Sequence, residues 1–373
     1  MKYCSKCLMP DTKPYLEFDE SGVCSACRAH EKKQDAANGV DWRQREAEFD
    51  DLIAWTRKQK ATVYDAAVPV SGGKDSITQV HRLLKYNLKI LAINIDYGIK
   101  TDIGVYNLNL IPQMGANLMI FRPEQSLHVK LIRLGLEEFG DPDLLSHTLL
   151  HAYPLRVAAS LGIPLFLHGE NSAFEYGGEK EIADNFYFTR KWFEKYAANK
   201  GCGAKFISQK YNTPFELLKQ YDYPDDMDLS RTKAVFSSYY FHWDSETHLK
   251  TAQKYGFKQL DEPREGTYRT YVGIDEKINR LHQYLKVLKF GYGRATDHAC
   301  EDIRSGRISR EEAKTLVKQY DLQPLGPEYS NDICAYLGYS KDRFNEIIEK
   351  YRNTQIWSWG TGGNRFIPGH LSE

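Results

Sequence analysis

The segment between Ala66 and about Tyr86 constrains the fold of this chain more than any other stretch. Apolar residues up to Val70 are followed by the hexapeptide Ser71–Ser76 and then by an amphipathic run. Two adjacent glycines in the hexapeptide allow a positive φ and a close approach of the backbone to a ligand. The pattern predicts a buried strand, a tight turn and the start of a helix.

The hexapeptide has the chemistry of a phosphate site. It consists of Ser71, Gly72, Gly73, Lys74, Asp75 and Ser76. The first turn of the following helix leaves N–H groups without partners, and the helix dipole favours an anion there. The lysine adds a mobile positive charge and the serines add hydroxyl donors. An ordinary glycine turn is the alternative, but these six residues stand where a phosphate loop belongs, so we expect them to bind a nucleotide.

The loop is not a Walker A motif, because G-x-x-x-x-G-K-[ST] does not fit it. It instead resembles the PP-loop of the N-type ATP pyrophosphatases. Members of that superfamily cleave ATP between the α- and β-phosphates and adenylylate a carbonyl-type oxygen, which a nitrogen or sulfur nucleophile then displaces. The resemblance implies a PP-loop ATPase fold of the α/β class: a Rossmann-like, adenine nucleotide α-hydrolase-like parallel twisted sheet flanked by helices, which uses ATP and Mg²⁺.

The cysteines near the beginning of the sequence predict a metal site. Cys4 and Cys7 form one C-x-x-C pair, and Cys24 and Cys27 form a second pair sixteen residues later. This spacing is typical of a four-thiolate zinc site, in which a structural role is the default. We expect a small zinc ribbon with a short strand over Tyr15–Phe18. Buried free cysteines and a redox or sulfur-relay role are the alternatives.

Length and pattern predict several structural units, because 373 residues are long for a single core. We expect a zinc ribbon over 1–40, a linker helix over 41–62, a PP-loop domain over 63–265 with an insertion or lid at about 180–230, and a helical C-terminal region over 266–373. Further strands are expected over 88–96, 117–121 and 163–168, and a strand or strand–turn over 232–242. Strand–helix–strand order predicts parallel pairing.

Charge and hydropathy limit the partners of the chain. Its 50 basic and 50 acidic residues balance, which argues against a broad nucleic-acid surface. No run approaches the about 20 apolar residues that span a bilayer, and the first residues lack the apolar core of a signal peptide. We therefore expect a cytoplasmic protein that binds no nucleic acid and does not insert into a membrane.

Two strand ends are candidate ligand sites. In PP-loop enzymes the adenine lies against the end of the second strand, so the resemblance implies contacts near Asn94 and Asp96. The expected fourth strand leads into a block of carboxylates, an amide, a histidine and glycines over 168–178. Open α/β sheets bind ligands at such carboxyl ends, which favours a substrate or ammonia site. An irregular glycine loop with a satisfied histidine is the alternative.

Two later segments also carry candidate side chains. Residues 290–298 place two glycines beside Arg294, which would bring a guanidinium onto a phosphate. A helix break with a surface arginine is equally consistent with that pattern. His242, Trp243 and Asp244 precede a predicted helix and are candidates for substrate contact, although an aromatic core cluster fits them as well.

Taken together, these motifs resemble the bacterial N-acetyl sugar amidotransferase family (WbpG/PseA-like) of surface-polysaccharide synthesis. The resemblance rests on the first ten residues, the hexapeptide, the blocks at 169–178 and 290–297, and Ile303–Ala313. It implies conversion of an acetamido group into an acetamidino group. The substrate would be a nucleotide-linked sugar, such as a diacetamido-uronic acid or a nonulosonic acid.

The resemblance also implies roles for individual residues. Attack of the amide oxygen on the α-phosphorus of ATP gives an O-adenylyl imidate and pyrophosphate, and ammonia then displaces AMP. Lys74 would offset the charge of the pyrophosphate and Asp75 would bind Mg²⁺ or cap the helix. The other expected site residues are Gly169 for the nucleotide, Glu170, Asn171 and Glu175 for the acetamido group or ammonia, and Arg294 for phosphate.

Ammonia requires a source, because no glutaminase motif is readable in this sequence. The family relies on a separate HisH-like glutaminase and a HisF-like cyclase homologue, and we expect the same partners here. One rival interpretation is a tRNA-thiolating PP-loop enzyme, but no C-x-x-C follows the loop. A second rival is a zinc-ribbon scaffold with a degenerate nucleotide site, against which the intact hexapeptide argues.

Overall fold

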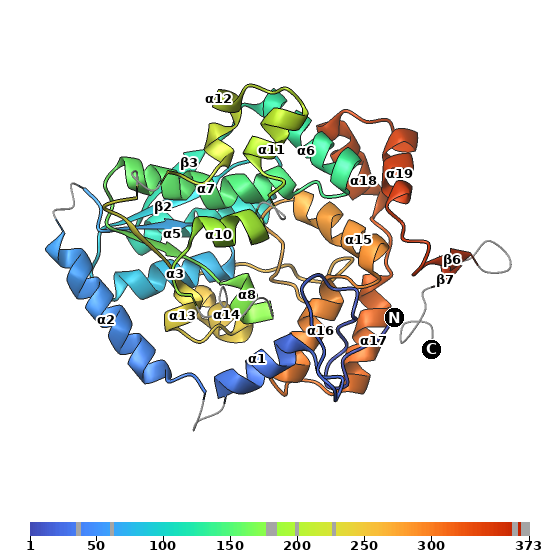
Figure 1. Cartoon of the computed structure of the whole chain (residues 1–373), viewed down its shortest axis with the longest axis horizontal. Coiled ribbons are helices and arrows are strands. Elements are labelled where there is room, and N and C mark those ends of the chain that lie inside the picture. Colours follow the sequence, from blue (N-terminus) through green and yellow to red (C-terminus); the bar gives the residue numbers. More distant parts are fainter. Residues whose placement is uncertain are drawn as a thin grey trace.

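The computed structural model describes residues 1–34, 39–59, 63–176, 185–197, 201–225, 229–359 and 365–366 (Figure 1). Its centre is a five-stranded parallel sheet in the order β3-β2-β1-β4-β5. The strands are β1 (Ala66–Pro69), β2 (Ile90–Ile95), β3 (Asn117–Phe121), β4 (Leu165–His168) and β5 (Lys233–Phe236). The predicted parallel α/β architecture is therefore confirmed.

The order of the strands reverses at β1, which places a crevice at the carboxyl end of the sheet. Ala66 of β1 pairs with Ile90 of β2 on one side and with Leu165 of β4 on the other. The chain leaves β1 toward one edge and returns to β4 on the opposite side. Doubly wound sheets bind ligands at this kind of switch point. The hexapeptide after β1 and the block after β4 both lie there.

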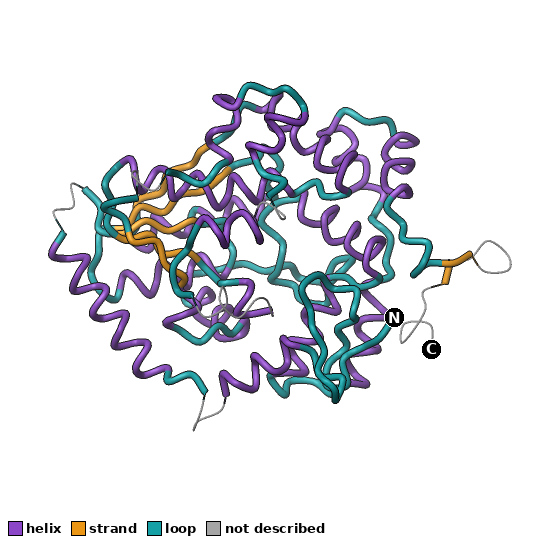
Figure 2. The backbone as a smooth tube through the Cα atoms, in the orientation of Figure 1, coloured by secondary structure: helices purple, strands orange, loops and turns teal. Residues whose placement is uncertain are grey.

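Helices cover both faces of the sheet, as Figure 2 shows. One face packs on α2 (Trp42–Lys58), α3 (Lys74–Leu84), α4 (Asp102–Leu108) and α5 (Leu110–Met114). The other face packs on α7 (Leu144–Ser160) and on Trp192 and Phe193. Alternate residues of β1 enter the two cores, with Val68 on the first face and Ala67 on the second. Because both faces of the sheet are buried, both sets of alternating side chains are apolar, and the strands read as continuous apolar runs.

The region predicted to be an irregular insertion contains short helices in its described parts. These are α10 (Arg190–Trp192), a π-helical turn over Phe193–Ala197, α11 (Ala204–Lys210), α12 (Phe215–Leu218) and a 3₁₀ turn over Lys219–Tyr221. Fully buried aromatic residues, among them Phe193 and Tyr221, hold these helices in the core. Residues 180–184, 198–200 and 226–228 of this region lie outside the described residues.

The C-terminal region is helical, as predicted. It contains α15 (Ile278–Phe290), α16 (Arg294–Arg304), α17 (Arg310–Asp321), α18 (Pro327–Leu337) and α19 (Lys341–Lys350), followed by the short antiparallel pair β6 (Ser358–Trp359) and β7 (Arg365–Phe366). Three of these helices, α15, α18 and α19, share a core with α6 (Gln125–Phe139) and α7. Ser309 and Glu312 form a capping box at the start of α17. The C-terminal helices are thus continuous with the sheet domain.

The N-terminal segment differs in one respect from its prediction. Tyr15–Phe18 does not form a strand, because Tyr15 has a φ of +63° in a turn and only Phe18 makes an isolated bridge, to Cys24. Helix α1 (Ser25–Gln34) begins directly after Cys24 and contains Cys27. The cysteine-bearing segment packs on α16 and α17 through Ala299 and Val317. Within the described residues, none of the helices combines the length and the hydropathy that crossing a lipid bilayer requires.

Candidate functional site

The hexapeptide after β1 forms a tight loop at the start of α3. Gly72 has a φ of +95°, and a Cβ there would lie 2.9 Å from the backbone nitrogen of Leu108. The N–H of Ser71 donates to Ser76 Oγ (3.0 Å), and the N–H of Gly73 donates to Ser71 Oγ (3.2 Å). In the described chain no side chain caps α3 at Gly73. The first N–H groups of this helix are therefore available to an anion.

A buried polar chain holds the acidic residue of this loop. Lys74 Nζ donates to Asp75 Oδ2 (2.8 Å), and the other carboxylate oxygen lies 2.7 Å from His248 Nδ1 on α14 (Ser245–Gln253). The second ring nitrogen of His248 lies 3.2 Å from Arg82 Nη2. Arginine only donates, so Nε2 accepts and Nδ1 carries the proton that is donated to Asp75.

The charges around Asp75 keep its carboxyl group ionised. Burial raises its pKa, but the Lys74 ammonium and the hydrogen bond from His248 outweigh burial and hold the pKa below its usual range. Burial lowers the pKa of His248, which is fully enclosed, so a neutral imidazole is consistent with the contacts to Arg82 and Asp75. The loop therefore presents a fixed carboxylate beside a lysine.

Two cavities meet at this loop. The smaller one, here called the loop cavity, has about 290 Å³ and is lined by Ser71, Gly73 and Asn94 at the ends of β1 and β2. The larger one, here called the ribbon cavity, has about 410 Å³ and extends toward the N-terminal cysteine segment. The residues that line both cavities are Lys74, Asp75, Glu170, Val272 and Arg294. The structure thus brings together side chains that the sequence predicted from three separate segments.

Asn94 and Asp96 differ in position although both were predicted at the end of β2. Asn94 Nδ2 donates to the carbonyl of Val70 (2.7 Å), while its buried Oδ1 has no partner in the described part of the chain. This acceptor belongs to a residue that lines the loop cavity, where it would receive a donor from a ligand. Asp96 pairs with Arg122 and accepts from the N–H of Gly98 (2.9 Å). It is absent from the described lining of both cavities.

Glu170 follows β4 and has a strongly shifted pKa. Its carboxyl group lies at the junction of the two cavities. Burial is the main cause that raises its pKa to about 7, and the nearby Asp75 carboxylate adds to the effect. A carboxyl group that titrates near neutral pH is suited to accept or to donate a proton.

The other predicted residues of this block have different surroundings. Asn171 Oδ1 accepts from Trp192 Nε1 (2.9 Å) and from the N–H of Ala173 (3.0 Å), so this side chain shapes the loop after β4. The carbonyl of Gly169 accepts from the N–H of Ser238 (3.3 Å). Glu175, on α8 (Ser172–Tyr176), lines the ribbon cavity and pairs with Lys33 of α1 at 2.6 Å. Residues 177 and 178 lie outside the described residues.

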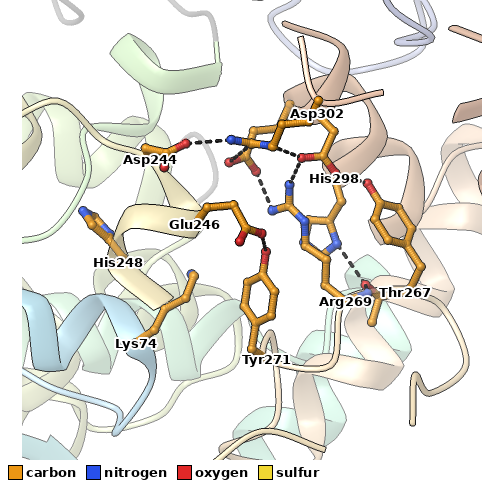
Figure 3. Close-up of polar contacts among 12 residues, drawn as sticks. Lys74, Asp244, Glu246, His248, Thr267, Arg269, Tyr271, His298 and Asp302 are labelled. Carbon is orange, nitrogen blue, oxygen red and sulfur yellow. Dashed lines mark hydrogen bonds and ion pairs between the residues drawn. The ribbon is translucent and has the colours of Figure 1, made fainter. Parts of the chain in front are cut away.

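Arg269, Glu301 and Asp244, which line the ribbon cavity, belong to a network that the sequence did not reveal. Arg269 donates to Glu301 and to Asp302, each at 2.7 Å, and Arg307 donates to Asp244 at 2.8 Å (Figure 3). Tyr271 donates to Glu246 of α14, as Figure 3 also shows. The predicted contact residues His242, Trp243 and Asp244 do line the ribbon cavity. Arg269 and Glu301 carry no motif, since only the packing of distant segments brings them together.

The two cysteine pairs come together as a metal site would require. The four sulfurs lie within 4.8 Å of one another and all four residues are buried. Cys4 Sγ and Cys27 Sγ are 3.9 Å apart, and Cys7 Sγ and Cys24 Sγ are 3.8 Å apart. A tetrahedron with Zn–S bonds of about 2.3 Å has edges of about 3.8 Å, so the geometry fits zinc. Four thiolates would complete the coordination, which indicates a structural site.

The comparison with protein families gives a match in the C-terminal region. Residues 265–365 match the family described as LPS biosynthesis protein WbpG-like, C-terminal domain. A search of curated proteins finds no match. The matched segment includes Arg269, Arg294 and Glu301, so the part of the chain that resembles this family contributes to both cavities.

Proposed function

We propose that this protein is an ATP-dependent amidotransferase that converts the acetamido group of a sugar into an acetamidino group. The reaction would serve surface-polysaccharide (LPS O-antigen) or nonulosonic acid biosynthesis, which the match of residues 265–365 to an LPS biosynthesis domain supports. The observation that carries the chemistry is the junction at which Lys74, Asp75, Glu170 and Arg294 line both cavities. A nucleotide in the loop cavity and an acceptor in the ribbon cavity would meet there.

In the first step the amide oxygen of the acceptor attacks the α-phosphorus of ATP. An amide carbon is a poor electrophile for ammonia, so its oxygen must first become a leaving group. A P–O bond forms, the bond to the bridging oxygen breaks, and pyrophosphate departs with the electron pair. The start of α3 binds this pyrophosphate, and Lys74 offsets its developing charge. Mg²⁺ would be held at Asp75, where it adds positive charge beside the phosphates.

In the second step ammonia adds to the imidate carbon. The C–O bond then breaks and AMP leaves with the electron pair. Glu170, whose pKa is raised to about 7, accepts a proton from the attacking nitrogen. Arg294 is placed to contact the α-phosphate from the wall that both cavities share. Glu175 acts through its pair with Lys33, which positions α8 beside the acceptor.

Ammonia would come from partner proteins, a HisH-like glutaminase and a HisF-like cyclase homologue. This part of the proposal predicts that the isolated chain uses ammonium far better than glutamine. If the purified chain used glutamine as efficiently as ammonium, the dependence on partner proteins would be contradicted.

The decisive experiment is mass spectrometry of nucleotide-linked acetamido sugars incubated with the protein, ATP, Mg²⁺ and ammonium. Replacement of oxygen by NH lowers the product mass by about one unit, and AMP and pyrophosphate should form in equal amounts. Lys74→Ala should abolish all three products, because it removes the charge at the leaving group. Release of ADP and phosphate, or AMP formation that depends on tRNA and not on a sugar, would refute the proposed reaction.

A further inference from the structure

The N-terminal cysteine segment forms one wall of the ribbon cavity. Met9, Lys13 and Tyr15 line the cavity from the segment between the cysteine pairs, and His30 and Lys33 line it from α1. A purely structural metal unit would only need to pack against the rest of the protein. Here seven of its residues, Pro14 and Ala26 included, line the space that the proposed function assigns to the acceptor.

Most positive charges in this cavity already have a carboxylate partner. Lys33 pairs with Glu175 at 2.6 Å, and Arg269 pairs with Glu301 at 2.7 Å. Lys74 pairs with Asp75, and Lys286 pairs with Asp297. Apart from Lys74, whose ammonium the proposed function assigns to the nucleotide, these cations are neutralised within the protein, so they add little attraction for an anionic acceptor.

Three cations differ from this pattern. Lys13, Arg294 and Arg304 line the cavity, and no ion pair connects them to a carboxylate in the described part of the structure. Arg304 Nη1 is buried and has no hydrogen-bond acceptor among the described residues. Burial lowers the pKa of Lys13; Asp297 opposes this effect, and the charges of Lys286 and Arg304 add to it, so Lys13 and Arg304 act on the same space. Buried donors without partners are costly unless a ligand satisfies them.

We propose that Lys13 and Arg304 bind a negatively charged group of the acceptor, so that the metal-binding segment is a substrate-binding element and not only a scaffold. Lys13 approaches from the segment between the cysteine pairs and Arg304 approaches from the end of α16. The charged group is a phosphate or a carboxylate, since both offer the acceptor oxygens that an ammonium and a guanidinium bind. This inference rests on the proposed function, because it assigns the acceptor to the ribbon cavity.

The test is calorimetric titration of the full chain with three probes in the presence of α,β-methylene-ATP. UDP-N-acetylglucosamine carries a diphosphate, N-acetylneuraminate carries a carboxylate without phosphate, and N-acetylglucosamine carries neither. At least one anionic probe should bind more tightly than N-acetylglucosamine. Lys13→Ala should weaken that probe about tenfold or more and leave the analogue's affinity unchanged. Lys6→Gln is the matched control, because Lys6 lies in the same segment but is half exposed and pairs with Glu31.

The outcomes separate the inference from the proposed function. A loss confined to UDP-N-acetylglucosamine identifies the diphosphate as the bound group, and a loss confined to N-acetylneuraminate identifies the carboxylate. Wild-type affinity of Lys13→Ala and Arg304→Gln for both anionic probes would overturn the inference, as would equal binding of charged and neutral probes to the wild type. The proposed function fails separately if the analogue does not bind or if no AMP forms with any acceptor.

Discussion

The imidazole of His248 links Asp75, in the loop after β1, to helix α14, which packs on α3. Its Nδ1 donates to Asp75 at 2.7 Å, and its Nε2 accepts from Arg82, which also donates to Ser237 Oγ at 3.0 Å. The Asp75 carboxylate is thereby held by α14, an element about 170 residues later in the chain. His248 does not line either cavity in the described structure, so it acts on the site through Asp75.

Replacement of His248 by alanine should lower the rate of pyrophosphate release about tenfold to a hundredfold, because Asp75 loses one of its two fixed partners. His248→Asn should recover part of the rate, since its amide reaches the same acceptor from a position like that of Nδ1. A coupled pyrophosphate assay would measure kcat and KM for both variants. If the alanine variant only lost folded protein, its rate would fall but His248→Asn would not recover it. Equal rates for the two variants at equal folded fractions would contradict the positioning role.

The pKa of Glu170 predicts the pH dependence of the reaction. Proton acceptance requires the ionised form, so kcat with ammonium corrected for free ammonia should rise with pH and reach half its maximum near pH 7. Glu170→Gln should lower kcat by about 10²–10⁴-fold and remove this inflection. A retained inflection in Glu170→Gln would assign it to another group.

The same shift has a consequence for stability. An unfolded glutamate titrates near pH 4.3, so the folded chain holds an extra proton between that pH and about 7. The stabilisation from this proton is full below pH 4 and is lost as the pH rises through about 7. Glu170→Gln should therefore gain stability relative to the wild type between about pH 5 and pH 8, by at most about 3 kcal/mol because the side chain is partly exposed. Urea denaturation at pH 5 and at pH 8 measures the free energy of unfolding of both proteins. The same difference between variant and wild type at the two pH values would contradict the raised pKa.

The elements around the loop cavity were predictable from local sequence. Strands β1, β2 and β3 are apolar runs that end at glycine or polar residues, and the N-terminal end of α3 follows directly from the glycine turn. The carboxyl ends of parallel strands share one edge of a sheet, so Asn94 and Glu170 could be assigned to one crevice from their positions alone.

The ribbon cavity was not predictable in the same way. Lys13 and Arg304 are almost 300 residues apart and line one cavity only because the cysteine segment packs on α16. Asp96 was a reasonable nucleotide ligand, yet Arg122 at the end of the neighbouring strand pairs with it. Local sequence patterns predict where a strand ends. They do not predict which side chain of the neighbouring strand contacts the residues at that end.

Loss of the metal should uncouple the cysteine segment from the C-terminal helices. Cys24→Ser removes one thiolate from a buried set of four, so we expect bound zinc to fall from about one per chain and the melting temperature to fall by at least about 5 °C. Cys202→Ser is the control, because Cys202 lies outside this set and is only partly buried. Elemental analysis and calorimetric melting give both values. Full zinc content in Cys24→Ser would contradict the four-thiolate site.

Gly72 provides a direct test of the loop geometry. Gly72 and Gly162 both have a positive φ, at +95° and +62°, so alanine strains the backbone at either position by about 1–2 kcal/mol. At Gly162 the added Cβ meets nothing within 4 Å, whereas at Gly72 it would lie 2.9 Å from the nitrogen of Leu108. Gly162→Ala should therefore lose only the strain energy and keep its affinity for α,β-methylene-ATP. Gly72→Ala must displace either the loop or α4, so we expect a larger loss of stability and at least a tenfold loss of affinity for the analogue. Equal affinities of the two variants would show that the conformation of this loop does not determine nucleotide binding.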